Sequence, residues 1–184
     1  MSFLSSFFKS KKNDMDILQS ILRIENININ QKTNEVLFSS AILLSPSDHD
    51  FFKTFSVSVN QITRKIPNIT KINIVDSDEH GIKWVILSST SFKNIISVTD
   101  EFSKIIASQY LGDRMIAGIF KSNINSQDCY WICNYSSSKF YPFVPQKNKT
   151  RNSELEMTLG HTLSKLGIPV EPHGKWYPIW DAPF

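Results

Sequence analysis

The C-terminal stretch of this chain is aromatic and rich in proline, which is unusual for a terminal segment. Residues 168–184 read IPVEPHGKWYPIWDAPF. Terminal segments are usually polar and frayed, because ordering them costs conformational entropy that little burial offsets. Here the aromatic side chains can bury large apolar areas, and the prolines limit the freedom that is lost on docking. We therefore expect this tail to pack back on its own domain or to hold a partner.

A second aromatic block, KFYPFVP at residues 139–145, precedes the last predicted helix. That helix, over residues 153–166, separates the block from the tail and can bring the two together as an antiparallel return. Because Trp and Tyr dominate interface energetics, the combined surface is a candidate partner-binding site. Its candidate residues are Phe140, Tyr141, Pro142, Phe143, Pro145, Arg151, Glu171, Trp176, Tyr177 and Trp180. The alternative is a satellite core beneath the helix, and one region can serve both roles.

Residues 1–12 are predicted to form an amphipathic, basic extension ahead of a single domain that spans residues 13–184. Apolar side chains in this extension share one face of a helix, and lysines follow at once. The apolar residues are Phe3, Leu4, Phe7 and Phe8, and the basic residues are Lys9, Lys11 and Lys12. We expect the segment to dock on an anionic membrane surface or on a partner. The alternative is a helix packed on the core.

The bulk properties are those of a globular protein with one core. The chain has 184 residues, of which 41% are hydrophobic and 20% are charged, and its net charge is +3. A charge this mild does not indicate nucleic-acid binding. No stretch approaches the roughly 18 apolar residues of a membrane span, and the N-terminus lacks the apolar run of a signal peptide. We expect a cytoplasmic location, with a peripheral position at the inner face of the cell membrane left open.

Apolar periodicity predicts an α+β fold in which helices pack against a mainly antiparallel sheet. Steps of three and four residues predict helices near residues 15–22 and over residues 51–66, 92–110 and 153–166. Hairpin strands are predicted over residues 35–44, 70–75, 82–87, 114–121 and 129–135. Residues 140–144 are predicted as an edge strand, where Pro142 is tolerated. Gly112 is expected just beyond the third helix, and Ser153-x-x-Glu156 is expected to form a capping box.

Residues with catalytic or metal-binding chemistry do not form a recognisable pattern. The sequence has no P-loop, no GxGxxG and no nucleophile elbow. Cys129 and Cys133 fall on one face of a predicted strand, too far apart for a disulfide and with too few accompanying ligands for zinc. We interpret them as small buried side chains. We predict no catalytic residues, no cofactor and no metal, and a Cys133–His161 pair is the one enzymatic alternative left open.

Glu171 is the unusual carboxylate, because it lies between Val170 and Pro172 in the apolar tail. A carboxylate in apolar surroundings needs hydrogen-bond donors or a cation. We expect Glu171 to accept hydrogen bonds from a Trp or Tyr of the tail, or to pair with Arg151 or Lys175.

The two aromatic blocks resemble those of the PspAB family, the PspA-associated proteins that are encoded with phage-shock-protein-A-type membrane-stress factors. The resemblance depends on FYPFVP at residues 140–145, RNSELE at residues 151–156 and the terminal PVEP and WYPIWDAP segments. Weaker similarity covers the rest of the chain, including the MSFL start and the strand that contains Trp84. The family implies a small accessory protein of envelope stress and supplies no known reaction.

This resemblance predicts a non-enzymatic adaptor that acts through protein–protein contacts near the inner membrane surface. The expected partner is a PspA-type coiled-coil protein or another component of the same system, with an anionic membrane surface nearby. The alternative is a chaperone-like module that binds an extended or helical segment of a client protein. An undetected hydrolase is the third hypothesis. Recovery of a PspA-type protein in a pull-down, as against a spread of unfolded clients, separates the first two.

Overall fold

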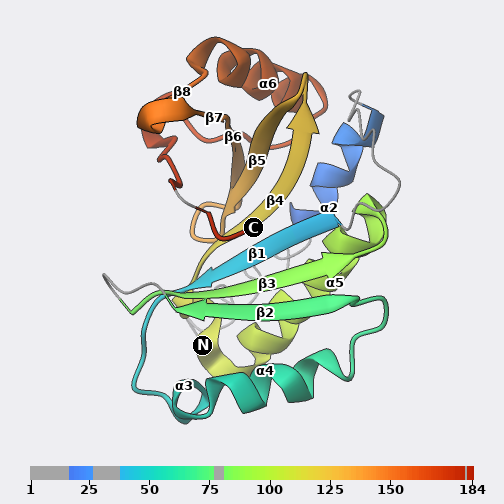
Figure 1. The fold of residues 1–184 in the computed structure, drawn as a ribbon, viewed down its shortest axis with the longest axis vertical. Helices are drawn as coiled ribbons and strands as arrows, with labels where there is room; N and C mark the ends of the chain where they lie inside the picture. The colour runs from blue at the N-terminus through green and yellow to red at the C-terminus, as the bar shows by residue number, and fades with distance from the viewer. Residues whose placement is uncertain (1–16, 27–37, 77–80, 181) are drawn as a thin grey trace, which may run out of the picture.

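A six-stranded antiparallel sheet forms the centre of the computed structural model, in the order β2-β3-β1-β4-β5-β6 (Figure 1). The structure describes residues 17–26, 38–76, 81–180 and 182–184. The strands are β1 Phe38–Leu44, β2 Lys71–Asp76, β3 Lys83–Ser89, β4 Met115–Ile124, β5 Gln127–Asn134 and β6 Lys139–Phe143. A short second hairpin pairs β7 Pro145–Gln146 with β8 Thr150–Arg151. The predicted α+β class, with its hairpins and its Pro142-containing edge strand, is confirmed.

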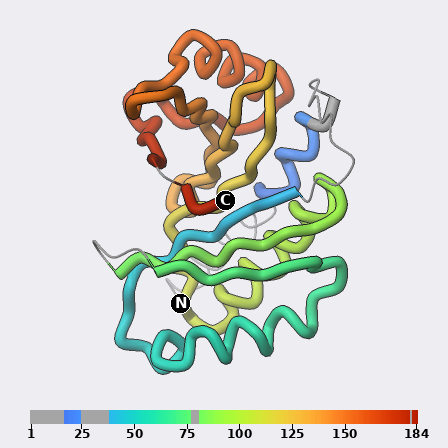
Figure 2. Tube along the Cα trace, viewed as in Figure 1, coloured from blue at the N-terminus to red at the C-terminus, as the bar shows by residue number. Residues whose placement is uncertain are grey.

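Helices surround the sheet on one face and at its ends. The α-helices are α2 Ile17–Ser20, α3 Asp50–Lys53, α4 Phe55–Thr63, α5 Phe92–Ile106 and α6 Ser153–Lys165. Shorter helical turns are η1 Ile21–Asn26, η2 Ala107–Leu111, η3 Gly112–Arg114, η4 Lys147–Lys149 and η5 His173–Lys175. The tube drawing shows α5 behind the strands, α4 below them and α6 at the opposite end (Figure 2).

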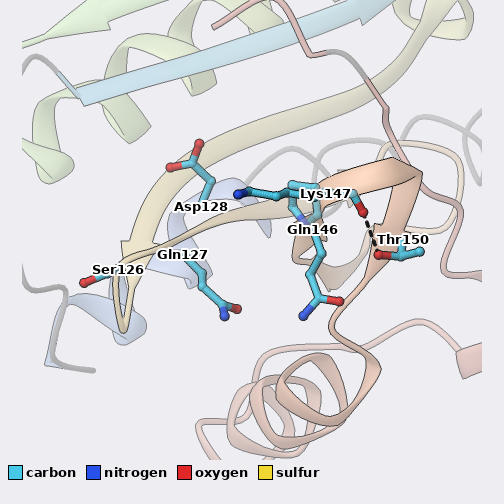
Figure 3. A pocket seen from close by; sticks show the side chains of 7 residues that line it. Ser126, Gln127, Asp128, Gln146, Lys147 and Thr150 are labelled. Atoms are coloured by element: carbon cyan, nitrogen blue, oxygen red, sulfur yellow. Dashed lines mark hydrogen bonds between the residues drawn. The ribbon is translucent and has the colours of Figure 1, made fainter.

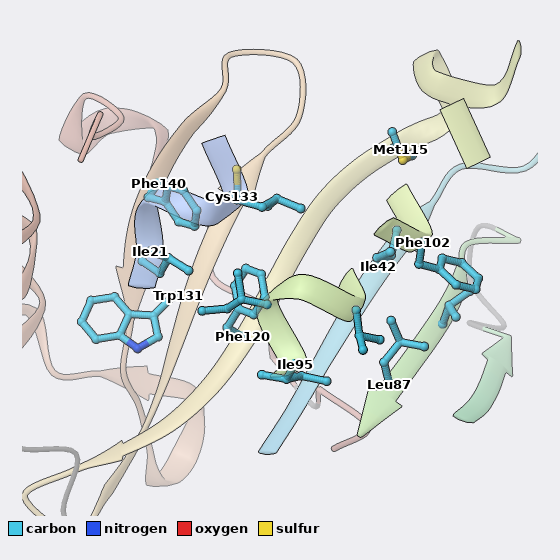
Figure 4. Close-up of a cluster of buried hydrophobic side chains, with 14 of the residues drawn as sticks. Ile21, Ile42, Leu87, Ile95, Phe102, Met115, Phe120, Trp131, Cys133 and Phe140 are labelled. Carbon is cyan, nitrogen blue, oxygen red and sulfur yellow. The ribbon is translucent and has the colours of Figure 1, made fainter. Parts of the chain in front are cut away.

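The face of the sheet that α5 covers carries the main hydrophobic core (Figure 4). Apolar residues of α5 recur at steps of three and four, so one face of the helix is apolar and packs on the strands. Ile95 and Phe102 of α5 are buried in the same cluster as Ile42 of β1 and Leu87 of β3. Several buried polar groups within this layer are paired with one another, which avoids the cost of an unpaired buried hydroxyl. The Oγ atom of Ser103 lies 2.6 Å from the hydroxyl of Tyr135.

The opposite face, here called the outer face, is also apolar. Successive strand residues point to opposite faces, so the residues between the core positions form this second surface. Its buried members are Ala41, Leu43, Trp84, Ile86, Ala117, Ile119, Tyr130, Ile132, Tyr141 and Phe143. An antiparallel sheet commonly leaves one face to solvent. In this protein both faces are covered, and the cover of the outer face is the C-terminal tail.

Three helix boundaries differ from the sequence predictions. The predicted helix over residues 51–66 is divided into α3 and α4 at Thr54, which has non-helical φ and ψ of −115° and 30°. The capping box at Ser153 is wrong, because Asn152 is the N-cap and its Oδ1 atom accepts a hydrogen bond from the Leu155 N–H at 3.1 Å. Gly112 does not supply the left-handed residue after the third helix, because Tyr110 occupies that conformation with a φ of 61°.

Tyr110 generates a prediction about stability. A residue with a Cβ atom is destabilised in the left-handed region by roughly 1–2 kcal/mol, and the Tyr110 side chain is 89% exposed, so little burial offsets that cost. We expect Tyr110→Gly to raise the free energy of unfolding by about 1 kcal/mol, measured by urea denaturation. Tyr110→Ala removes the ring but keeps the Cβ atom. Equal gains in the two variants would contradict the conformational explanation.

Candidate partner-binding site

The C-terminal tail folds back on the domain, as the sequence predicts. After α6 the chain runs beside β6, where the Phe140 N–H donates to the Pro169 oxygen at 2.8 Å and the Glu171 N–H donates to the Phe140 oxygen at 2.9 Å. Residues 176–180 and 182–184 then lie over the outer face of the sheet (Figures 1 and 2). Phe184 ends this path at β4, where Lys121 Nζ donates to the Phe184 oxygen at 3.0 Å.

The two aromatic blocks contact one another, so the prediction that they share a surface is confirmed. The ring of Tyr141 stacks on that of Trp176 at a centroid distance of 6.4 Å, and Phe143 meets Trp180 edge-to-face at 5.0 Å. Phe184 extends the contacts, with its ring 6.3 Å from that of Trp84 and 5.9 Å from that of Tyr130. We call this set the aromatic layer. It consists of Trp84, Tyr130, Tyr141, Phe143, Trp176, Trp180 and Phe184.

Tyrosine hydroxyls of the aromatic layer hold the main chain of the tail. The Tyr141 hydroxyl donates to the Tyr177 oxygen at 3.2 Å, and burial raises the pKa of Tyr141. Tyr130 donates to the Phe184 oxygen at 3.4 Å. Burial and the nearby Asp128 carboxylate raise the pKa of Tyr130 to about 12. Both phenols therefore stay protonated at neutral pH and remain donors.

The ring of Trp176 packs against α6 at Gly160, where the helix has no side chain, and we call this space the notch. Gly160 is buried in the middle of that helix, and a Cβ atom at this position would collide with the six-membered ring of Trp176. The indole N–H of Trp176 donates to the Glu171 oxygen at 2.8 Å. A glycine in a helix interior is unfavourable, so its place here is explained by this close approach.

Gly160→Ala is therefore expected to lower the free energy of unfolding by about 2 kcal/mol, because overpacking forces Trp176 out of its notch. Gly174→Ala is the matched control, since nothing lies within 4 Å of a Cβ atom at Gly174. Urea denaturation followed by tryptophan fluorescence measures both variants. A G160A variant as stable as wild type would show that Trp176 is not held by this notch.

A buried ion pair joins the start of α6 to the tail. The Glu156 carboxylate is fully buried and lies 2.6 Å from Arg151 Nη2 and 2.7 Å from Arg151 Nε. Its second oxygen accepts the Val144 N–H at 2.8 Å, and Arg151 Nη1 donates to the Trp176 oxygen at 2.9 Å. The guanidinium carbon is 5.4 Å from the centroid of the Phe143 ring. One pair thus connects β6, β8, α6 and the tail.

Breaking this pair should be strongly destabilising, because the partner that remains is a buried charge. We expect Arg151→Met and Glu156→Gln each to lower the free energy of unfolding by about 3 kcal/mol, and the double variant to lose less than the sum of the two. The comparison is Lys53→Met in the exposed pair with Asp50, which should cost less than about 1 kcal/mol. Additive losses in the double-mutant cycle would contradict a direct coupling.

Glu171 has a structural environment that its position in the tail only partly predicts. It is 3% exposed, and its carboxylate accepts hydrogen bonds from Ser137 Oγ and from Asn134 Nδ2. The expected bond from a tail tryptophan exists, but the Trp176 indole donates to the main-chain oxygen of Glu171. Arg151 pairs with Glu156 instead. Glu171 therefore fastens the turn between β5 and β6 to the tail.

The candidate partner-binding residues divide by exposure. Phe140, Tyr141, Pro142, Phe143, Glu171 and Trp176 are buried. Arg151, Pro145 and Trp180 are partly exposed, and Tyr177 is 64% exposed. The buried side chains shape the surface from beneath, whereas Tyr177 and Trp180 are accessible from solvent. Their role in binding a partner stays a prediction.

Some members of the surface were not among the candidates. Trp84 and Tyr130 lie on strands far from the tail in sequence, and their only sequence signal is the alternation of strand residues between faces. Met157 of α6 is 51% exposed, an unusual value for a large apolar side chain in a helix beside the tail. The predicted membrane-surface residues Phe3 to Lys12 lie outside the described residues. Of the helices that the structure describes, none is long and apolar enough to cross a membrane.

An open hollow of about 670 Å³ borders the surface between the β4–β5 turn and the β7–β8 hairpin (Figure 3). Its lining is polar: Ser126, Gln127, Asp128, Pro145, Gln146, Lys147 and Thr150. Thr150 Oγ1 donates to the Lys147 oxygen at 2.8 Å, and Asp128 lies 3.3 Å from Lys121 Nζ. The first contact stabilises the β7–β8 hairpin, and the second joins β4 to β5. The described lining residues include neither a cysteine nor a histidine.

The two cysteines lie inside the main core on the α5 face. Burial raises the pKa of both thiols, so they stay protonated at neutral pH. Cys133 is fully buried, whereas His161 is exposed on α6. Within the described ranges, no cluster of His, Cys, Asp and Glu side chains is arranged to hold a metal ion.

Comparison with known proteins gives one match. The family model described as PspA associated protein B matches residues 1–184, the whole chain. No curated protein and no solved structure matches the chain.

Proposed function

Because the chain belongs to the PspA associated protein B family, we propose that it is a non-enzymatic adaptor of a PspA-type membrane-stress system. The family match over residues 1–184 is the observation that carries the proposal. The family name implies association with PspA. Proton-bearing, buried thiols support the non-enzymatic part, since the most reactive side chains of the chain are withheld from solvent.

The contact surface of this adaptor consists of Trp180 of the aromatic layer and the adjoining Tyr177, whose side chains are accessible from solvent. Tyr177 and Trp180 sit on a base of fully buried side chains and are fixed by the Arg151–Glu156 pair through Trp176. A rigid base lowers the entropy cost of binding, and aromatic side chains beside an arginine are typical of interface hot spots. The partner is a PspA-type coiled-coil protein, whose helices can present an apolar stripe to these rings.

Binding of the purified chain to a PspA-type protein tests the proposal. We expect Tyr177→Ala to weaken binding at least 10-fold and to leave stability within about 0.5 kcal/mol, because its side chain is mostly exposed. Tyr110→Ala is the matched control, since Tyr110 is an exposed tyrosine at the end of α5 and outside the aromatic layer. Calorimetric titration of the three proteins provides the measurement. A wild-type chain that does not bind would contradict the proposed function.

One observation favours the chaperone-like alternative. The outer face of the sheet accommodates residues 176–180 and 182–184, a segment that contains prolines and forms neither helix nor strand beyond Trp176, and we infer that a client segment can be held in the same manner. A pull-down separates the two functions. Recovery of many unfolded proteins, without a PspA-type protein, would favour the chaperone-like module.

We further propose that residues 1–12 bring the adaptor to the inner membrane surface. The four apolar residues Phe3, Leu4, Phe7 and Phe8 can enter the interface, and each of Lys9, Lys11 and Lys12 can add about 1 kcal/mol of attraction to anionic lipid. We expect the full chain to co-sediment with anionic vesicles, less so at high salt. A chain that lacks residues 2–12 should stay in the supernatant. Replacing the three lysines with Gln tests the electrostatic part, and equal sedimentation of all three proteins would contradict an anchoring role.

A further inference from the structure

A polar row crosses the outer face of the sheet beyond the end of the tail. The strand register places Ser39 of β1 directly opposite Ser88 of β3, and Ser88 directly opposite Lys71 of β2. Residues opposite one another in antiparallel strands project to the same face and lie close together. The side chains of Ser39, Ser88 and Lys71 therefore project from neighbouring positions on this face. Asn73 lies on the same face, opposite Ile86 in the next row.

A cavity of about 220 Å³ lies over this row, and we call it the Lys71 cavity. Ser39, Ser88, Lys71 and Asn73 supply its polar lining, and Ile86 and the end of the tail, Pro183 and Phe184, supply its apolar lining. A water molecule occupies roughly 30 Å³ in the liquid, so the space exceeds that of a single water. The lining thus has a polar side formed by the strands and an apolar wall formed by the tail.

The polar side chains of the Lys71 cavity have no polar partner within the part of the chain that the structure describes. Among the described residues, none of the four side chains has a hydrogen-bond or ion-pair partner, although Ser88 is 8% exposed. Of the lining residues that the structure describes, Lys71 alone has a charged side chain. The carboxylate at the other end of β2, Asp76, lies 2.6 Å from Lys83 Nζ. The cavity therefore offers hydrogen-bond donors and the positive charge of Lys71.

We propose that the Lys71 cavity binds a phosphate group. The Lys71 ammonium and the neighbouring serine hydroxyls are hydrogen-bond donors, and a phosphate can accept from them through several oxygens. Hydrogen bonds that involve a charged group are stronger than those between neutral groups. Ile86 and Phe184 would contact the carbon part of a phosphate ester. A soluble phosphate ester and an anionic lipid headgroup share this chemistry. The proposal does not depend on the partner of the aromatic layer.

Occupancy of this cavity would be felt by the tail. Phe184 lines the cavity with Pro183, and it also packs against Trp84 and Tyr130 and is held by Lys121. A ligand that contacts Phe184 therefore fixes the end of the aromatic layer. The amide signal of Phe184 can therefore report on binding, although Phe184 is far from Lys71 in the sequence.

Titration of the ¹⁵N-labelled full chain with inorganic phosphate, at constant ionic strength, tests the proposal. We expect saturable amide shifts at Ser39, Lys71, Ser88 and Phe184. Lys71→Gln should raise the Kd at least 5-fold, and Ser88→Ala should raise it in the same direction. The matched control is Lys65→Gln, which removes an exposed lysine near the end of α4 and should keep the wild-type Kd. Shifts that do not saturate, or that are equal in the Lys71 and Lys65 variants, would overturn the proposal.

Two further arms identify the source of the phosphate. Glycerol phosphate is titrated in the same manner, and vesicles of phosphatidylglycerol are compared with vesicles of phosphatidylcholine. Competition by phosphatidylglycerol alone would assign the site to a lipid headgroup, and saturation by glycerol phosphate without competition would assign it to a soluble ester. Thermal unfolding of each variant shows whether it is folded. A folded Lys71→Gln variant with unchanged phosphate affinity would be decisive against the site.

Discussion

The buried pair of Arg151 and Glu156 is the interaction on which the C-terminal half of the structure depends. A fully buried carboxylate is costly unless it is paired with a cation and hydrogen-bonded. Glu156 meets this requirement with the Arg151 side chain and the Val144 N–H. Arg151 can reach it because the β7–β8 hairpin turns the chain back beside α6. Arg151 Nη1 then donates to the Trp176 main-chain oxygen, so the direction of the tail follows from the position of the pair.

The tail replaces a helix as the second cover of the sheet. A helix buries a stripe of side chains, whereas an extended segment must bury comparable area with fewer residues. Large rings solve this problem, because each aromatic side chain buries 150–250 Å². Trp176, Trp180 and Phe184 are each placed over a ring of the sheet, and the prolines between them keep the segment extended. The composition of the tail is thus explained by its structural role, and its exposed rings leave a surface that a partner can use.

Sequence patterns predict most of the fold, because they report local periodicity. The hairpins, the edge strand with Pro142 and the return of the tail follow from alternation and composition alone. The failures come from tertiary packing. The Ser-x-x-Glu pattern also occurs when Asn152 caps the helix, and only the fold shows that Glu156 turns inward to Arg151. The third helix, α5, ends at Ile106, and the turn that follows it contains Tyr110 in the left-handed conformation and the buried Leu111, so a nearby glycine is a poor guide to the boundary. The layer on which the candidate site stands includes Trp84 and Tyr130, which no local pattern connects to the tail.

The notch at Gly160 has a consequence for how such a chain can change in evolution. Position 160 lacks a side chain only because the Trp176 ring fills that space. A larger residue at position 160 is acceptable once position 176 has become smaller, and a smaller residue at position 176 leaves a void that a larger residue at position 160 can fill. A substitution at one of these positions is therefore tolerated only together with a compensating substitution at the other. In the family, substitutions at these positions should be correlated, with the volume lost at one recovered at the other.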